Sequence, residues 1–248
     1  MAWAYSASRS SSCVRIRSRN GKSAGSTDVL IRVRHAGVCG TDLHIWEWDS
    51  WASQRLKPPV IVGHEFAGEI VELGQEAQVA GLLAVGDLVT AEGHIVCGHC
   101  LQCRLGDAHL CQRTQIIGVD RDGAFADYIA MPASNVMKLD GIPTEIGAIM
   151  DPMGNAVHTV LEARVPGSTV FVLGCGPIGC FAVGVARAAG ASLVIASDFN
   201  PRRLELARAM GAHVTLDPAR IETMYSSDLQ KPAGANFWDW LKTAQFKI

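Results

Sequence analysis

The sequence feature that most constrains the fold is a glycine-rich turn between a short apolar strand and a helix of small residues. The strand is expected over 169–173, the turn has the pattern GxGxxG over 174–179, and the helix continues to residue 189. In this context the glycines permit a tight turn and let the backbone approach a pyrophosphate, whose charge meets the helix N-terminus. The pattern therefore predicts a parallel α/β sheet that binds a dinucleotide.

The same alternation of strands and helices continues beyond the turn. A second strand is expected over 193–197, a helix over 201–210 and a third strand over 213–216, and helical spacing over 146–163 precedes them. This order is half of a doubly wound parallel sheet. The pattern weakens after Asp217, so the second half of the sheet is not expected in these 248 residues.

Residues 28–150 predict a compact, barrel-like β domain. Apolar side chains alternate with other residues from Val29 to Val33, further strands are expected over 59–63 and 67–73, and a turn followed by another strand is expected over 85–89. Short strands separated by glycine turns are typical of this architecture.

The pattern divides the chain into four segments. We expect a divergent or disordered N-terminus over 1–27, the β domain over 28–150, the partial dinucleotide-binding domain over 151–220 and an unassigned tail over 221–248. The first segment contains arginines and serines but no Asp or Glu, which is typical of a transit peptide. A wrongly assigned start of the chain accounts for the same composition equally well.

Composition and charge exclude several classes of protein. With 48% apolar residues, 19% charged residues and a net charge of −2, the chain is too apolar to be disordered throughout. It is too neutral to bind nucleic acid through bulk charge. The uncharged run 165–186 is long enough to cross a bilayer, but its glycines and prolines indicate a strand, a turn and a buried helix instead. We therefore expect a small-molecule partner, with neither nucleic acid nor membrane.

Four closely spaced cysteines are the strongest single motif. Cys97, Cys100, Cys103 and Cys111 have two-residue gaps followed by a seven-residue gap, which is typical of a structural zinc site with four thiolates. An iron–sulfur cluster and an absence of metal remain as alternatives, although bacterial clusters have a shorter last gap followed by proline. Free thiols at such spacing predict a reducing compartment, and hence the cytoplasm, with organellar targeting by residues 1–27 left open.

A second candidate metal site combines Cys39, His64 and Glu65. A cysteine, a histidine and a carboxylate form a mixed donor set that suits zinc with one open coordination position, which is the catalytic arrangement. Taken singly, each residue also fits a simpler role, as a core cysteine or a singly hydrogen-bonded histidine. Spacing alone does not show that the loops converge.

Asp198 is the candidate that sets the choice of cofactor. It ends the second strand, 19 residues after Gly179, where a carboxylate accepts hydrogen bonds from a ribose 2′-hydroxyl and repels a 2′-phosphate. This position predicts NAD rather than NADP. The alternative is an N-cap for the helix that starts at Pro201. Arg203 lies either beside the adenosine ribose or on a solvated helix face.

Taken in order, these motifs resemble the zinc-dependent medium-chain alcohol dehydrogenases, and within that family the branch that oxidises L-threonine. The most telling stretches are CGTDLHIWEWDSW over 39–51, EGHIVCGHCLQC over 92–103 and DPMGNAVHT over 151–159. The resemblance covers about Asp28 to Asp217. Residues 1–27 and those from about Ile221 onward depart from it, and family members continue well past position 248.

The resemblance implies a fold, a reaction and a role for each site residue. The implied fold is α/β, with a GroES-like β-barrel-type catalytic domain followed by a partial Rossmann sheet. The implied reaction is oxidation of the threonine hydroxyl to 2-amino-3-oxobutanoate with NAD, and family members are homotetramers. The implied site comprises a catalytic zinc on Cys39, His64 and Glu65, a proton relay through Thr41 and His44, a carboxylate near the metal at Asp151, and an NAD site with Gly174, Gly176, Ile178, Gly179, Asp198 and Arg203.

Two other functions fit the same motifs. One is a related polyol or diol dehydrogenase with the same zinc chemistry, and the other is an inactive zinc-binding fragment of such an enzyme. We expect the 248-residue chain to bind two zinc ions, one structural and one catalytic, and to turn over threonine poorly or not at all. The reason is that a three-stranded parallel sheet leaves an edge and a face uncovered.

Overall fold

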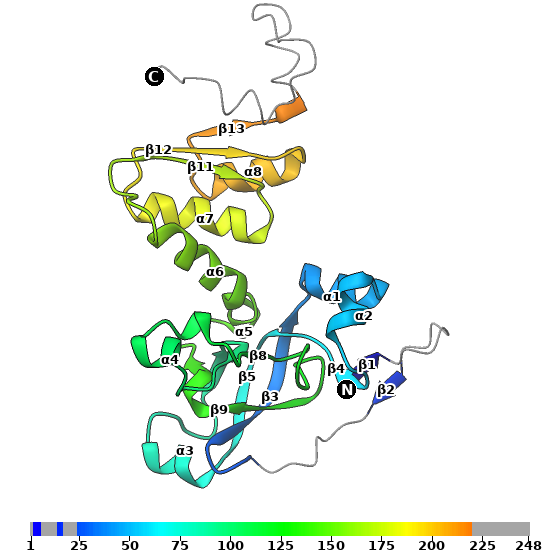
Figure 1. The fold of residues 1–248 in the computed structure, drawn as a ribbon. Helices are drawn as coiled ribbons and strands as arrows, with labels where there is room; N and C mark the ends of the chain where they lie inside the picture. The colour runs from blue at the N-terminus through cyan, green and yellow to red at the C-terminus, as the bar shows by residue number, and fades with distance from the viewer. Residues whose placement is uncertain (1, 6–13, 17–23, 220–248) are drawn as a thin grey trace, which may run out of the picture. The chain divides into compact units, whose positions relative to one another are not determined.

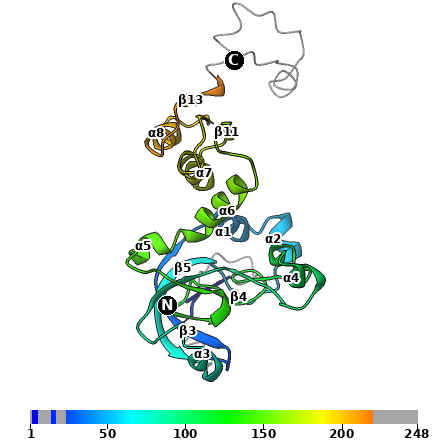
Figure 2. The same ribbon diagram turned by 90° about the vertical axis from the view of Figure 1, so that its left-hand side faces the viewer.

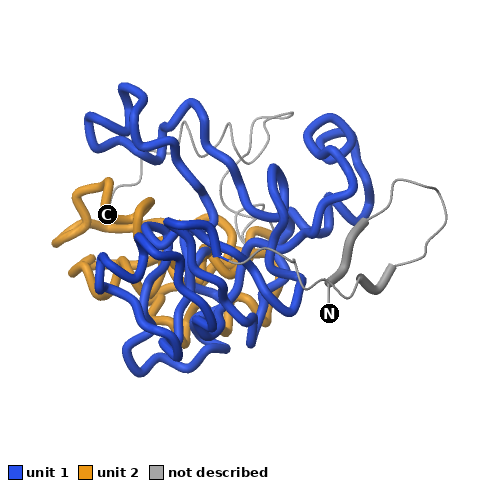
Figure 3. Tube along the Cα trace, turned by 90° about the horizontal axis from the view of Figure 1, so that it is seen from below, with its two compact units in different colours: residues 1–151 blue, residues 152–248 orange. Residues whose placement is uncertain are grey.

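The computed structural model describes residues 2–5, 14–16 and 24–219. The chain divides into two compact units, residues 1–151 and 152–248 (Figure 3). Each unit has its own sheet and its own apolar core.

A five-stranded antiparallel sheet forms the centre of the first unit (Figure 1). Its strands, in spatial order, are β10 (Val136–Lys138), β6 (Leu88–Ala91), β5 (Glu65–Leu73), β3 (Asp28–Gly37) and β9 (Tyr128–Pro132). The two longest strands pair from Val29 with Leu73 to Gly37 with Glu65, so the end of β3 lies beside the start of β5. The core of this sheet contains Val29, Ile31, Phe66, Ile70, Val89, Ile117, Ile129 and Met131.

Smaller elements complete the first unit. One small sheet contains β2 (Val14–Ile16), β1 (Ala2–Tyr5) and β4 (Val60–Ile61), and another contains β7 (His94–Ile95) and β8 (Gln115–Ile116). The helices are α1 (Gly40–Glu47), α2 (Ser50–Arg55), α3 (Gln75–Ala80), α4 (Leu101–Leu105) and α5 (Thr144–Gly147), with the 3₁₀ turns η1 (Ala108–Leu110) and η2 (Ala133–Asn135). Figure 2 shows α3 and α5 in a second view of this unit.

The second unit contains a parallel sheet of three strands in the order β11 (Thr169–Leu173), β12 (Leu193–Ser197) and β13 (Val214–Leu216). Helices α7 (Pro177–Ala188) and α8 (Pro201–Ala209) connect these strands and lie along one face of the sheet (Figure 1). Along β11 the side chains alternate, with Val172 buried and Phe171 and Leu173 exposed. The opposite face of this sheet is therefore open in the described residues.

The structure confirms the predicted α/β fold class, with an antiparallel β unit followed by a parallel three-stranded unit. The strands predicted over 169–173 and 193–197 have the predicted bounds. No helix in the described residues has both the length and the apolar character that a membrane span requires. The predicted tail over 221–248 lies outside the described residues.

Several predicted elements have different bounds in the structure. The helix expected over 146–163 is divided into α5 and α6 (Met150–Leu161). Pro152 has no N–H to donate to the carbonyl of Ala148, so the first helix cannot continue through this point. The strand expected over 59–63 shortens to Val60–Ile61, and the strand expected within 85–89 begins only at Leu88 and continues to Ala91.

Candidate metal centres and cofactor-binding turn

The four cysteines of the predicted structural site lie together in the first unit. Cys97 follows β7, Cys100 precedes α4, Cys103 lies within α4, and Cys111 follows η1. The Sγ atoms are separated by 3.5 Å for Cys100 and Cys103, 3.6 Å for Cys97 and Cys111, and 3.9 Å for Cys100 and Cys111. Zinc–sulfur bonds of about 2.3 Å place tetrahedral ligands about 3.8 Å apart.

These separations distinguish the alternatives for the four-cysteine lobe, the segment from Cys97 to Cys111. They are far longer than the bond of about 2.05 Å in a disulfide. An iron–sulfur cluster inserts several atoms between the thiolates and holds them further apart than a single ion does. The geometry therefore fits one tetrahedral ion.

Hydrogen bonds and burial give Cys111 and Cys103 different affinities for protons. Backbone N–H groups of Cys97 and Arg113 lower the pKa of Cys111 to about 6. Burial and the neighbouring sulfurs of Cys100 and Cys111 raise the pKa of Cys103 to about 12. One ligand is thus prepared as a thiolate before metal binds, whereas another must lose its proton to the incoming ion.

The mixed candidate site also comes together in the structure. Cys39, His64 and Glu65 each place one ligand atom within 4.8 Å of the other two. Cys39 is the N-cap of α1, and Glu65 begins β5 beside the end of β3. The pairing of β3 with β5 therefore brings together loops whose convergence spacing alone could not show.

A glycine provides the space for this donor set. A Cβ atom on Gly37 would lie 2.3 Å from Oε2 of Glu65 and 3.0 Å from its Cβ. Any residue other than glycine at position 37 would displace the Glu65 carboxylate. Burial raises the pKa of Glu65, and the charge of Asp151 adds to that effect while His64 opposes it. A cation at the site would offset the cost of burying this carboxylate.

Asp42 is a residue of this site that the sequence analysis missed. Its Oδ2 accepts a hydrogen bond of 2.8 Å from the backbone N–H of Cys39, and its Oδ1 lies 4.0 Å from Nδ1 of His64. Both Oδ1 and Nδ1 are buried and have no hydrogen-bond partner. A histidine that binds metal through one ring nitrogen commonly donates the other N–H to a carboxylate. Oδ1 of Asp42 and Nδ1 of His64 are positioned for this interaction, which supports a metal ion on the other ring nitrogen of His64.

The two predicted relay residues lie on α1. Thr41 Oγ1 is 3.8 Å from Sγ of Cys39, and His44 lies three residues further along the helix, on the same face. Nδ1 of His44 is 2.7 Å from Oδ2 of Asp49. Asp49 also caps α2 by accepting from the N–H of Ala52, and these two hydrogen bonds lower its pKa. Asp49 was missed as a site residue, although an aspartate just before a helix is a recognisable cap signal.

Asp151 belongs to a different cluster from the zinc donor set. Its carboxylate, in the first turn of α6, groups with Glu92 and His94, and these three residues place ligand atoms within 4.8 Å of one another. Its charge nevertheless acts on Glu65. Glu92 and His94 were not identified from the sequence, because nothing in the short segment between β6 and β7 indicates a partner so far along the chain.

The glycine-rich turn in the second unit has space for a ligand on its outer side. A Cβ atom on Gly174 or Gly176 would meet nothing within 4 Å, and Gly174 has a positive φ of +89°. A Cβ on Gly179 would lie 1.9 Å from the carbonyl oxygen of Gly174, so Gly179 permits close packing of strand and helix. Ile178 is 47% exposed in the first turn of α7. This open cradle at a helix N-terminus fits a pyrophosphate.

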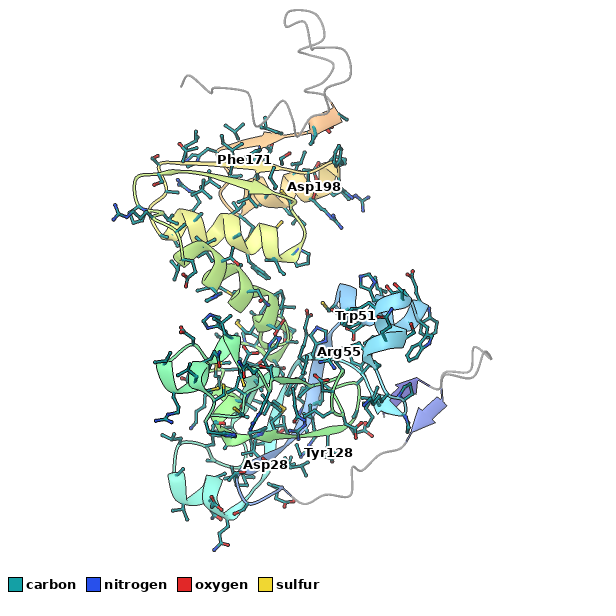
Figure 4. All side chains as sticks on the ribbon, in the orientation of Figure 1. Asp28, Trp51, Arg55, Tyr128, Phe171 and Asp198 are labelled. Carbon is teal, nitrogen blue, oxygen red and sulfur yellow. The ribbon has the colours of Figure 1, made fainter. Side chains whose placement is uncertain are left out.

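Asp198 holds the turn in place. Its Oδ2 accepts 2.8 Å from the N–H of Cys175, its Oδ1 accepts 2.8 Å from the N–H of Asn200, and Arg203 approaches to 3.6 Å. Burial alone would raise the pKa of Asp198, but these hydrogen bonds and the arginine lower it below its usual value. The cap of α8 is Asn200 and not Asp198, so the alternative role as the helix cap is wrong. Figure 4 labels Asp198 beside α8.

The chain is similar to known proteins in both units. The family described as Alcohol dehydrogenase GroES-like domain matches residues 25–141, and the family described as Zinc-binding dehydrogenase matches residues 177–239. The chain is 49% identical to the L-threonine 3-dehydrogenase of Symbiobacterium thermophilum over 197 residues, which are 79% of this chain and 55% of that protein. It is 52% identical to the L-threonine 3-dehydrogenase of Bacillus licheniformis over 186 residues, or 75% and 53%.

A solved structure of a zinc-binding dehydrogenase is also similar to this chain. A zinc-binding dehydrogenase from Sinorhizobium meliloti 1021, described as putative and bound to NADP, matches with a TM-score of 0.74 and 35% identity over 82% of this chain and 58% of that one. The chain belongs to the zinc-dependent alcohol dehydrogenase family. It spans about half the length of the curated relatives that it matches.

Proposed function

We propose that this chain is part of an enzyme that oxidises the secondary alcohol of L-threonine to 2-amino-3-oxobutanoate, with zinc and NAD. The observation that carries the proposal is the convergence of Cys39, His64 and Glu65 in the GroES-like unit. The identity of about 50% to proteins named L-threonine 3-dehydrogenase supports this substrate over a polyol or a diol.

The two proposed zinc sites have different tasks. The four cysteines would hold a structural ion, because four thiolates close its coordination. Cys39, His64 and Glu65 would hold the catalytic ion and leave one position for the substrate hydroxyl. When bound, zinc supplies a Lewis acid that lowers the pKa of an alcohol, and NAD supplies the acceptor for the hydride.

The chain's own residues then remove the hydroxyl proton. Thr41 is the first acceptor in the proposed relay, since its hydroxyl lies beside Cys39. His44 is the second, and its side chain is 61% exposed, so it can pass the proton to water. Asp49 accepts from Nδ1 of His44, which leaves Nε2 as the nitrogen that receives the proton. Relays of this kind contribute about 10² to 10⁴ in rate.

The second unit would bind the cofactor. The turn from Gly174 to Gly179 would take the pyrophosphate, and Ile178 would contact the cofactor from the first turn of α7. Asp198 retains unused lone pairs on both oxygens, so it can accept from a ribose 2′-hydroxyl while it holds the turn. Its negative charge favours NAD over NADP, and Arg203 would lie beside the ribose.

A substrate panel tests this function. NADH formation is measured with L-threonine, sorbitol and 2,3-butanediol, for this chain and for a version extended to the length of its relatives. We expect the extended version to use threonine with the highest kcat/KM. A higher kcat/KM with sorbitol or butanediol would transfer the proposal to a polyol or diol dehydrogenase. Absence of turnover by the extended protein with every substrate would support the zinc-binding remnant.

A further inference from the structure

The corner between α1 and α2, residues 48–51, places two side chains against His44 that carry no proton in the proposed relay. Oδ2 of Asp49 lies 2.7 Å from Nδ1 of His44. The ring of Trp51, labelled in Figure 4, meets the imidazole of His44 in a T-shaped contact, with the ring centroids 6.3 Å apart and the ring planes at 64°. The same short segment thus supplies a carboxylate and an indole to one imidazole.

Trp48 turns the chain so that Asp49 returns to His44. The backbone of Trp48 is left-handed, with φ 50° and ψ 47°, a conformation that bulky residues rarely adopt. Its side chain packs against the core cluster that contains Ile45 and Ala52, and this packing holds the turn. The N–H of Trp48 donates to the carbonyl of Ile45 at 3.2 Å, and the N–H of Asp49 donates to the carbonyl of His44 at 3.4 Å. The corner is therefore closed by its own backbone.

Asp49 uses both of its carboxylate oxygens. Oδ1 accepts from the N–H of Ala52 at 2.9 Å and caps α2, while Oδ2 faces Nδ1 of His44. The hydrogen bonds from Ala52 and His44 lower the pKa of Asp49, so this carboxyl group is ionised at neutral pH. An ionised carboxylate only accepts hydrogen bonds. In a neutral His44 the proton therefore lies on Nδ1, and Nε2 keeps its lone pair.

We propose that Asp49 and Trp51 are positioning residues of the proton relay, Asp49 for the tautomer of His44 and Trp51 for the plane of its ring. This inference rests on the proposed function. Both residues act through His44 and touch no reacting atom. The side chain of His44 is 61% exposed, so packing alone does not fix an imidazole at this place. A base accepts a proton efficiently only when its lone pair has the right direction, and the aspartate of serine-protease triads orients a histidine in the same way.

Asparagine at position 49 separates the two tasks of the carboxylate. Asparagine caps helices about as well as aspartate, and its one carbonyl oxygen is needed by the N–H of Ala52. Its amide N–H groups then face Nδ1 of His44, which must accept, so the proton moves to Nε2. The opposite orientation of the amide would point N–H groups at the N–H of Ala52. Asp49→Asn should therefore keep α2 and reverse the tautomer of His44.

NMR measures this tautomer directly, without any assay of turnover. The zinc-loaded chain is labelled with ¹⁵N-histidine, and His44 is assigned among the eight histidines from the spectrum of His44→Gln. At about pH 8.5, where ordinary imidazoles are neutral, we expect the proton on Nδ1 in the wild-type chain and on Nε2 in Asp49→Asn. Asp49→Ser keeps a capping oxygen but is too short to reach His44, so the preference for Nδ1 should also be lost.

Trp51→Ala tests the second positioning residue, and Trp46→Ala is its matched control. Trp51→Ala should retain the proton on Nδ1 but increase the ps–ns mobility of the His44 ring, which ¹³C relaxation of the imidazole reports. Trp46 is 62% exposed and lies about 200° around α1 from His44, so its removal should alter neither measurement. Thermal unfolding shows that each variant is folded.

Turnover supplies an independent second measurement. In the version extended to the length of the relatives, Asp49→Asn should lower kcat with threonine by about tenfold or more and leave KM unchanged, because Asp49 acts on the base and not on the substrate. Four results would each overturn the proposal: a proton on Nε2 in the wild-type chain, an unchanged tautomer or an unchanged kcat in Asp49→Asn, and equal ring mobility in Trp51→Ala and Trp46→Ala. Absence of turnover by the extended wild-type protein would instead refute the proposed function, while NMR still decides how His44 is positioned.

Discussion

Gly37→Ala is expected to remove the catalytic zinc and leave the structural one. The new Cβ atom would lie 2.3 Å from Oε2 of Glu65, about 1.1 Å short of the 3.4 Å at which ordinary contact begins. The Cβ of Glu65 lies 3.0 Å from the same point, so the start of the side chain must also shift by a few tenths of an ångström. The Glu65 carboxylate must therefore move by about 1 Å, whereas metal–ligand distances tolerate about 0.2 Å.

This displacement converts into a measurable loss of affinity. Perturbing the support of a metal site costs about 10- to 100-fold in affinity, or about 1.4 to 2.7 kcal/mol, and moving a ligand costs at least as much. Zinc content after dialysis against a weak chelator should therefore fall from about two ions per chain to about one. Competition with a chromophoric chelator gives the affinity of the weaker site directly.

Gly40→Ala is the matched control. Gly40 is the first residue of α1, and a Cβ atom there meets nothing within 4 Å. This variant should keep both ions, and alanine in place of glycine in a helix adds up to about 1 kcal/mol of stability. If Gly37→Ala keeps both ions with wild-type affinity, Glu65 is not a zinc ligand and the reasoning from this contact is wrong.

Three further predictions follow from the same geometry. The zinc affinity of the four-cysteine lobe, measured by calorimetry, should fall with decreasing pH. The fall should be steeper below about pH 6, because Cys111 then also takes up a proton. A pH-independent affinity would exclude thiolate ligands. Asp198→Ala should reduce the NAD/NADP binding ratio by about tenfold or more. The pKa of Asp198 is lowered in the folded state, so its contribution to stability should be present at neutral pH and disappear as the pH falls below about 4. Both effects are read from cofactor titration and from denaturation at several pH values, and an unchanged ratio would mean that Asp198 only holds the turn. Gly179→Ala should destabilise the second unit by about 1–3 kcal/mol in urea denaturation, since its Cβ would lie 1.9 Å from the Gly174 carbonyl. Gly176→Ala, whose Cβ meets nothing within 4 Å, should lose only the smaller N-cap preference of glycine over alanine; equal midpoints for the two variants would contradict this.

Local patterns predicted the second unit well. The strand at 169–173, the glycine turn and the strand at 193–197 depend on short continuous apolar runs and on glycine geometry, which neighbouring residues determine. The split between α5 and α6 was missed because the apolar spacing continues across Pro152. The proline signal was present in the sequence and should have taken precedence.

The candidate sites depend more on long-range pairing. The four cysteines were recognisable because they lie within 15 residues of one another. The pairing of Gly37 with Glu65 brings Cys39 close to His64, and no local pattern reports that register. Asp42 was missed because its role depends on an orphaned atom of His64, 22 residues further along the chain. Glu92 and His94 meet Asp151 in the first turn of α6, which begins at Met150 and lies far from them along the chain.

Zinc anomalous scattering from crystals of the zinc-loaded chain tests the central claim most directly. The account predicts two zinc peaks in the first unit. One should lie among the Sγ atoms of Cys97, Cys100, Cys103 and Cys111, and the other should be bound by Cys39, His64 and Glu65 with a water in the remaining position. A single peak among the four cysteines, or a second peak to which Glu65 and His64 contribute no ligand, would contradict the claim that this chain carries the zinc centre of a dehydrogenase.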